Sequence, residues 1–140
     1  MSFQSYQGIL DSASAGRQVD LEFLSPTTFR SGGKNIIFPQ PELVFGSYLN
    51  KWQTFSPIKL DDSLPSWFDK VMVARYRLQT HILDFGSYRE VGFTGKCRFE
   101  LDKATPDKVV VTLNALADFA LYCGTGAKTT MCMGQTRRTK

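Results

Sequence analysis

A glycine-rich stretch near the end of the chain, CGTGAKTTMCMGQTRR at positions 123–138, combines residue types that bind phosphate groups. Glycine lets main-chain N–H groups converge and lets another chain approach closely. Lysine and threonine add donors, and arginine can hold one phosphate with two parallel hydrogen bonds. The stretch therefore predicts a phosphate-binding loop, for a nucleotide or for a nucleic-acid backbone. The alternative is structural: a helix C-cap at Gly124 and a turn at Gly134, with nothing bound.

The spacing within this stretch argues against a nucleotide. A P-loop has the pattern G-x-x-x-x-G-K-[ST] and lies between a strand and a helix. Here Ala127 separates Gly126 from Lys128, and Leu121 stands where the first glycine of the pattern would be. The loop also follows a predicted helix, which reverses the order of elements. We therefore interpret it as a loop that contacts nucleic-acid backbone.

Positive charge is concentrated in two segments of the chain. The formal net charge is +4 at pH 7, and residues 124–140 contain four Lys or Arg and no acid. A second acid-free segment, residues 25–40, contains Arg30 and Lys34. Clustered cations predict phosphate contacts, although two solvated loops would have the same composition. The residues predicted to contact nucleic acid are Thr27, Arg30, Lys34, Gly124, Gly126, Lys128, Thr129, Gly134, Gln135, Arg137 and Arg138.

The cysteine and histidine content predicts a protein without a metal or another cofactor. Three cysteines, at positions 97, 123 and 132, form no CxxC pair, and His81 is the single histidine. These residues cannot supply a zinc site of the usual spacing, and unpaired thiols are typical of a reducing compartment. The N-terminus lacks the features of a signal peptide, and no apolar run approaches the roughly 20 residues of a membrane helix. We expect a cytoplasmic protein with no membrane partner.

Apolar periodicity and turn signals predict the elements that position these residues. Residues 18–24 alternate as a half-buried strand that Ser25 and Pro26 end, and Gly32 and Gly33 mark a turn. Pro41 opens a helix with a continuous apolar face that ends at Phe55. The other predicted elements are a short helix or ordered lead-in over 4–16, a helix over 64–73, a hairpin of strands over 75–85 and 91–101, a helix that Thr105 caps and that ends near Gly124, and a short strand over 135–138.

This order of elements predicts an α+β protein with the ferredoxin-like βαββαβ fold. Its antiparallel sheet has helices on one face, an extra helix follows the first one, and the glycine-rich loop follows the last helix. Residues 1–17 are predicted as an N-terminal lead-in and residues 18–140 as a single domain. The fold hosts many functions, so it does not select one.

Four segments resemble the CRISPR repeat-RNA processing endoribonucleases of the repeat-associated mysterious protein superfamily, and in particular their C-terminal ferredoxin-like domain. Their order and spacing cover most of the chain from residue 19 onward. The segments are VDLEFLSPTTFR at 19–30, similar to the family's strand and F-x-[ST]-P-T-x-F turn; FPQPELVFGSYLNKWQTF at 38–55, similar to its Pro-initiated helix; VGFTGKCRF at 91–99, similar to its G-F-x-G strand; and residues 113–137, similar to its closing helix and glycine-rich loop.

The resemblance implies cleavage of precursor CRISPR RNA at its repeats without a metal ion. The 2′-hydroxyl attacks the neighbouring phosphate and leaves a 2′,3′-cyclic phosphate and a 5′-hydroxyl, with a histidine as general acid or base and a tyrosine or lysine assisting. Family members usually carry this histidine in a first ferredoxin-like domain, whereas this chain is expected to contain the second, RNA-binding one. His81 is the catalytic candidate of this chain, although its place in a predicted strand favours a sheet-face residue.

The implied partners are CRISPR repeat RNA, an N-terminal ferredoxin-like domain and other CRISPR effector subunits. Four functions remain open: the RNA-binding half of a repeat-RNA endonuclease, a non-catalytic scaffold subunit of a CRISPR ribonucleoprotein, a complete small nuclease, or an unrelated binding domain with a basic tail. The nuclease would use His81 with Tyr76, Tyr88 or a lysine. We expect the first function, in which the predicted hairpin places four cations near the RNA or on a solvated sheet face: Arg75, Arg77, Lys96 and Arg98.

Overall fold

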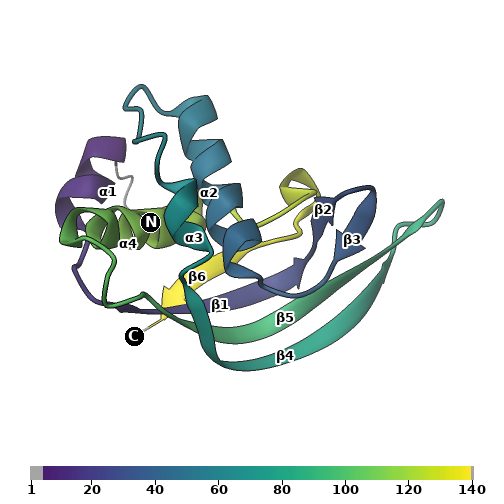
Figure 1. Ribbon diagram of the computed structural model, residues 1–140. Coiled ribbons are helices and arrows are strands. Elements are labelled where there is room, and N and C mark those ends of the chain that lie inside the picture. Colours follow the sequence, from purple (N-terminus) through teal and green to yellow (C-terminus); the bar gives the residue numbers. More distant parts are fainter. Residues whose placement is uncertain (1–4, 140) are drawn as a thin grey trace.

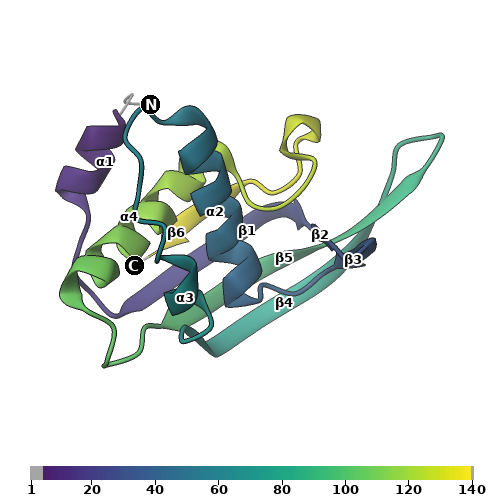
Figure 2. The ribbon, with the colours of Figure 1, turned by 45° about the horizontal axis from the view of Figure 1, so that its top comes forward.

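The computed structural model describes residues 5–139, which form an antiparallel sheet with helices packed on one of its faces (Figure 1, Figure 2). The strands of this sheet are β1 (Gln18–Thr27), β4 (Met72–Asp84), β5 (Arg89–Glu100) and β6 (Thr136–Thr139), in the spatial order β4-β5-β1-β6. The helices are α1 (Tyr6–Ser12), α2 (Pro41–Phe55), α3 (Pro65–Phe68) and α4 (Asp107–Cys123), with a 3-10 turn η1 (Thr129–Met131). The predicted ferredoxin-like βαββαβ fold with one extra helix is confirmed.

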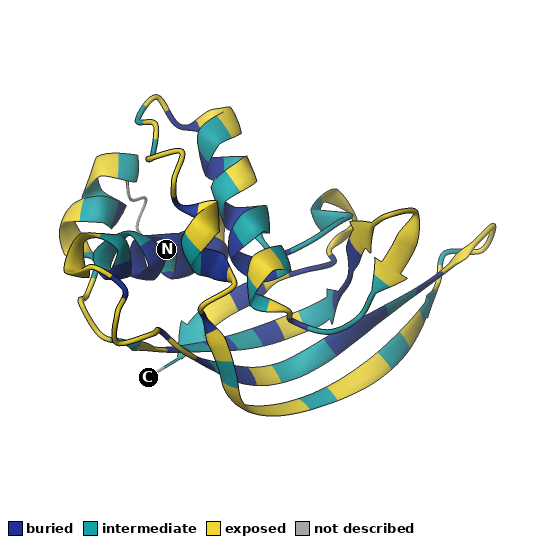
Figure 3. Cartoon of the chain, in the orientation of Figure 1, coloured by how far each residue is buried: buried dark blue, intermediate teal, exposed yellow. Residues whose placement is uncertain are grey.

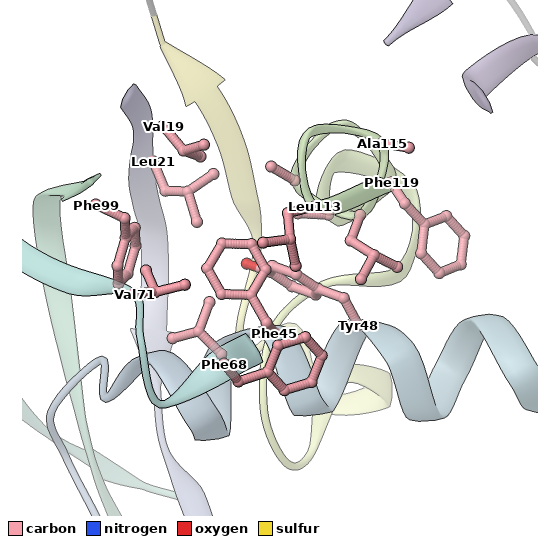
Figure 4. Packing of buried hydrophobic residues seen from close by; sticks show 14 of the residues in the cluster. Val19, Leu21, Phe45, Tyr48, Phe68, Val71, Phe99, Leu113, Ala115 and Phe119 are labelled. Atoms are coloured by element: carbon pink, nitrogen blue, oxygen red, sulfur yellow. The ribbon is translucent and has the colours of Figure 1, made fainter. Parts of the chain in front are cut away.

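The hydrophobic core lies between the sheet and the helices, where Figure 3 shows the buried residues. Strand β1 turns the apolar members of its alternating pattern toward the helices, as predicted. Figure 4 shows Phe45 of α2 beside Phe99 of β5, and their ring centroids are 5.6 Å apart in an edge-on arrangement. The prediction that Phe55 belongs to the buried apolar face of α2 is wrong. Phe55 is the last residue of the helix and is 71% exposed, because it lies beyond the turn that Trp52 anchors in the core.

Helix α1 packs on the same core as the rest of the chain. Ser5 caps it through a hydrogen bond from the amide of Gly8 to its Oγ (3.0 Å), and Ile9 is 2% exposed. The ring of Tyr6 meets the edge of Trp52 at a centroid distance of 5.0 Å. The boundary at residue 17 stays a prediction, and residues 1–4 of that lead-in lie outside the described part of the chain.

Strand β1 does not end at Leu24, as its proline predicts, but continues to Thr27. Its pairing with β5 is irregular between Phe23 and Thr27, where a bulge accommodates Pro26. The glycine-rich loop supplies the missing partners on the other side: the amide of Leu24 donates to the carbonyl of Gln135 (2.7 Å), and the carbonyl of Pro26 accepts from the amide of Gly134 (3.0 Å). Tertiary hydrogen bonds therefore extend the strand.

Two helix boundaries also differ from the prediction. The helix predicted over 64–73 is shorter in the structure, where α3 has four residues. Val71 is buried after the end of α3, and β4 already begins at Met72. β-branched side chains such as Val73 fit a pleated sheet better than a helix, and Val73 pairs with Phe99. Helix α4 begins at Asp107, one residue later than a Thr105 cap would place it.

Candidate nucleic-acid interface

The glycine-rich loop, residues 124–135, connects α4 to β6 and lies beside two hairpins (Figure 2). The first hairpin consists of β2 (Phe29–Ser31) and β3 (Lys34–Ile36), joined by a glycine turn. The second is the long β4–β5 hairpin, whose far end extends beyond the helices (Figure 1). The loop belongs to one of the two basic segments predicted to meet nucleic acid, residues 124–140. It therefore lies beside the other basic segment, residues 25–40.

Main-chain amides of the loop donate both within the loop and to neighbouring parts of the protein. Thr125 donates to the carbonyl of Gly134 (2.8 Å), Gly126 to Ser47 Oγ (3.0 Å), and Ala127 to the carbonyl of Thr28 (2.9 Å). The amides of Gly134 and Gln135 donate to residues 26 and 25 of β1. Because these donors are occupied, phosphate contacts at the loop fall mainly to side chains.

Glycine is required here for close approach of the backbone. A Cβ atom on Gly126 would lie 2.1 Å from the carbonyl oxygen of Thr28, and one on Gly134 would lie 2.1 Å from the carbonyl oxygen of Thr125. Both glycines also have a positive φ, +78° and +76°, which side-chain-bearing residues rarely adopt. The glycines thus fasten the loop to Thr28, between β1 and β2, and close the loop on itself.

A buried hydroxyl chain fixes the base of the loop to the core. The hydroxyl of Tyr48 lies 2.7 Å from Thr125 Oγ1, which lies 2.6 Å from Thr136 Oγ1. All three residues are at most 2% exposed, and Figure 4 shows Tyr48 reaching inward from α2. Burial raises the pKa of the Tyr48 phenol well above its ordinary value, so the hydroxyl stays neutral and serves as a structural hydrogen-bonding group.

Lys51 of α2 also holds the loop, although the sequence analysis did not single it out. Its Nζ donates to the carbonyl oxygens of Cys123 (3.3 Å), Gly124 (3.3 Å) and Gly126 (3.2 Å). The cation therefore neutralises the carbonyl end of α4, and burial lowers the pKa of its ammonium group. The signal in the sequence is a lysine placed between the core positions Tyr48 and Trp52 of one helix.

Replacing Lys51 by methionine is expected to destabilise the protein and loosen the loop. The substitution keeps the apolar stem but leaves three carbonyl groups without their charged donor, at a cost of about 1–3 kcal/mol. Urea unfolding measures the cost, and amide hydrogen exchange at Gly126 measures the loosening. Lys59→Met is the matched control, because Lys59 donates to two carbonyls at the end of α2 instead. Equal exchange rates at Gly126 in the two variants would contradict this role.

Two of the predicted RNA contacts converge beside the loop, at the buried carboxylate of Glu90. Lys128 Nζ lies 3.5 Å from Glu90 Oε1 and 5.4 Å from the ring centroid of Tyr88. Arg30 Nη1 donates to Asn35 Oδ1 (3.1 Å), and Asn35 Nδ2 donates to Glu90 Oε2 (3.5 Å). We call Arg30, Asn35, Glu90 and Lys128 the loop cluster. It joins the loop to both hairpins and keeps two cations at the surface.

The other predicted contacts are distributed differently. Lys34 is exposed at the β2–β3 turn, close in sequence to the loop cluster. Thr27 is completely buried and bonds the carbonyl of Ser25, so it contributes to the fold. Thr129 is half-buried beside Gly124, and the side chain of Gln135 is exposed.

The two arginines of β6 point to opposite faces of the sheet. Arg137 is opposite Glu22 and forms an ion pair with it (2.6 Å). Arg138 forms an ion pair with Asp118 of α4 (3.0 Å) and also contacts the buried Asn114. The structure therefore ties Arg138 to α4, and it keeps Arg137 on the face of the sheet opposite the helices.

His81 lies on the edge strand β4, opposite Gly92. Its Nε2 is 2.8 Å from Thr94 Oγ1. The two tyrosines considered as catalytic helpers lie elsewhere: Tyr76 packs edge-on against Phe38, and the hydroxyl of Tyr88 donates to Met131 Sδ (3.2 Å). The structure brings neither tyrosine to the imidazole.

Residues 5–139 include the histidine, the three cysteines and all the acidic residues of the chain. In this range no group of three or more His, Cys, Asp or Glu side chains forms a cluster that could hold a metal ion. Cys97, Cys123 and Cys132 are free thiols. None of the helices in the described range is long and apolar enough to span a membrane.

Comparison with known proteins places this fold and loop in a family. Residues 21–136 match the family described as CRISPR-associated endoribonuclease Cas6. The chain belongs to the Cas6 family. The match runs from β1 through the glycine-rich loop to the start of β6, so it includes two of the four segments that carried the resemblance completely and nearly all of the other two.

Curated Cas6 endoribonucleases share about a third of their aligned residues with this chain. The Streptococcus thermophilus protein is 32% identical over 115 residues, which cover 80% of this chain and 46% of the relative. A Mycobacterium tuberculosis protein is 29% identical over 123 residues, which cover 86% of this chain and 38% of the relative. The chain thus spans less than half the length of these Cas6 relatives.

Solved Cas6 structures have the same fold as this chain. A Thermus thermophilus Cas6 structure aligns with a TM-score of 0.89 and 29% identity, covering 97% of this chain and 58% of the other. A Cas6 product complex aligns with a TM-score of 0.88 and 29% identity, covering 98% of this chain and 57% of the other. The two Cas6 structures therefore extend well beyond the part that this chain matches.

Proposed function

We propose that this chain binds CRISPR repeat RNA as the RNA-binding half of a Cas6-type endoribonuclease that cleaves the repeat without a metal ion. The observation that carries the proposal is the Cas6 match over residues 21–136, which includes the glycine-rich loop. Arg30 and Lys128 of the loop cluster, with Lys34 beside them, are the cations that contact the RNA backbone. Such contacts fix the position of the RNA without reading its sequence.

The acid–base chemistry in this proposal comes from another ferredoxin-like domain or another subunit. A general acid or base must reach the proton that it transfers, and a helper must lie beside it. The side chain that forms a hydrogen bond with His81 is that of Thr94, and neither Tyr76 nor Tyr88 lies beside the imidazole. The free thiols fit the cytoplasm as the proposed compartment, because it keeps cysteines reduced. Further CRISPR effector subunits are proposed partners.

A cleavage assay tests the division between binding and chemistry. The chain is mixed with repeat RNA from its own host in EDTA, and the products are resolved on native and denaturing gels. A shifted but intact RNA is the expected result. Cleavage at one position that His81→Ala abolishes would overturn the division and place an active site in these residues, and RNA that does not shift would overturn the proposal itself.

Replacing Lys128 by glutamine is expected to weaken RNA binding and its dependence on salt. Each phosphate contact contributes roughly 0.9 to the slope of log K against log salt for a duplex, so the slope should fall by about one. Binding measured between low and high salt gives this slope. Lys103→Gln is the control, because this lysine is exposed in the connection between β5 and α4, away from the loop cluster. An equal slope in the two variants would contradict the assignment.

A further inference from the structure

Four cations face one another across β4 and β5 on the side of the sheet opposite the helices. In the register of these strands Arg75 lies directly opposite Arg98, and Arg77 lies directly opposite Lys96. Strand β1 shows which face this is: its buried residues point to the helices, and Asp20, opposite Arg98, lies on the other face. Figure 1 shows no helix over this side of the described chain. We call Arg75, Arg77, Lys96 and Arg98 the sheet cluster.

The sheet cluster is unfavourable for the fold by itself. Directly opposite side chains on one face are about 4.5–5.5 Å apart at Cβ, and like charges in such pairs destabilise a sheet. Of the two acids of β1 on this face, Asp20 pairs with one cation of the cluster and Glu22 pairs outside it: Asp20 accepts from Arg98 Nε (2.9 Å), and Glu22 binds Arg137. Within residues 5–139, Arg75, Arg77 and Lys96 have no carboxylate oxygen within 4.0 Å.

The surface around the cluster is hollowed. A cavity of about 550 Å³ is lined by the four cations and Asp20, and also by Leu21, Tyr76, Cys97 and Thr139. The neighbouring positions on the same face carry Gln79 and Thr94, which are opposite each other in the register. Tyr76 alternates with the cations along β4, and its ring packs edge-on against Phe38. His81 follows Gln79 on the cationic face, and its Nε2 lies 2.8 Å from Thr94 Oγ1. The hollow thus offers four cations, and polar side chains adjoin it on the same face.

We propose that the sheet cluster is a second phosphate-binding site, which takes the backbone of an unpaired RNA segment adjoining the part held at the loop cluster. This inference rests on the proposed function. Backbone phosphates supply the counter-charge that Arg75, Arg77 and Lys96 lack. Contacts between these cations and backbone phosphates read charge and not sequence. A protein partner is less suitable, because the centres of protein interfaces are enriched in aromatic residues and depleted in lysine.

The test uses a double variant, Arg77→Gln with Lys96→Gln, and repeat RNA that carries unpaired flanks. Affinity is measured between low and high salt. Each contact with a single strand contributes roughly 0.7 to the salt slope, so the slope should fall by about 1.4. The control Lys103→Gln with Lys108→Gln removes the same charge from exposed positions near the start of α4. The sheet variant should also melt at a higher temperature than the wild type at low salt, and high salt should reduce this gain.

The outcomes separate this inference from the proposed function. A normal slope in the sheet variant, together with a reduced slope in Lys128→Gln, overturns the second site and leaves the proposed function standing. An acidic protein surface would then be the partner to test at this face. An equal loss of slope in the sheet variant and its control would mean general charge attraction and would also overturn the site. A wild-type chain that binds no repeat RNA overturns both proposals.

Discussion

Gly126→Ala is expected to destabilise the protein and to remove the RNA binding proposed for the glycine-rich loop. The added Cβ would lie 2.1 Å from the carbonyl oxygen of Thr28, so the loop must move away from this residue. The backbone at Gly126 also has a φ of +78°, which costs an L-residue about 1–2 kcal/mol. The movement would break the bond from the amide of Ala127 to the carbonyl of Thr28 and separate Lys128 from Glu90. Urea unfolding and a native gel shift with repeat RNA measure the two effects.

Gly33→Ala is the matched control for stability. Gly33 has nearly the same backbone conformation, with a φ of +76°, but a Cβ at this position meets no atom within 4 Å. It should therefore show the conformational cost alone, and the difference between the two variants isolates the collision with Thr28. If both variants lose the same free energy of unfolding, the close approach of the loop to Thr28 does not stabilise the fold.

The protein is expected to unfold in alkali, between about pH 9 and 12. Burial raises the pKa of the Cys97 thiol to about 12 and that of the Cys123 thiol to about 12, from 9.0. Below pH 9 the folded and the unfolded protein both keep these thiol protons, so the contribution of the buried thiols to stability is fully present. Above it the unfolded chain releases them first, and stability is lost as the pH rises toward 12. The loss can approach roughly 4 kcal/mol per thiol, which is large beside a total of about 5–15 kcal/mol.

Two other buried groups, the Tyr48 phenol and the Lys51 ammonium group, also change the stability of the protein in alkali. The raised pKa of Tyr48 adds to the alkaline loss, whereas the lowered pKa of Lys51 opposes it, because the unfolded chain holds that proton longer. Circular dichroism during titration from pH 7 to 12 measures the net effect. In Cys97→Ala the drop in unfolding free energy between pH 8 and 11 should be smaller than in the wild type. Cys132→Ala is the control, because Cys132 is exposed, and its drop should equal that of the wild type. An equal drop in all three proteins would contradict this cause.

The fold could be predicted because its determinants are local. Alternating apolar residues in β1, the helical spacing from Pro41, and the glycine after α4 each indicate an element within a few residues. The errors occur where distant segments determine the outcome. β1 passes Pro26 because the amide of Gly134 bonds its carbonyl, and the predicted second helix is shortened because Val73 joins the sheet beside Phe99.

The sequence by itself determined the family, the order of elements, and the two basic segments. Only the tertiary structure decided what each cation does. Lys51 holds the loop and Arg138 binds Asp118, whereas Lys128 pairs with Glu90, and Arg77 faces Lys96. The physical reason is that ion pairing depends on distances of a few ångströms between residues far apart in the chain. The packing of strands and helices sets those distances, and composition does not.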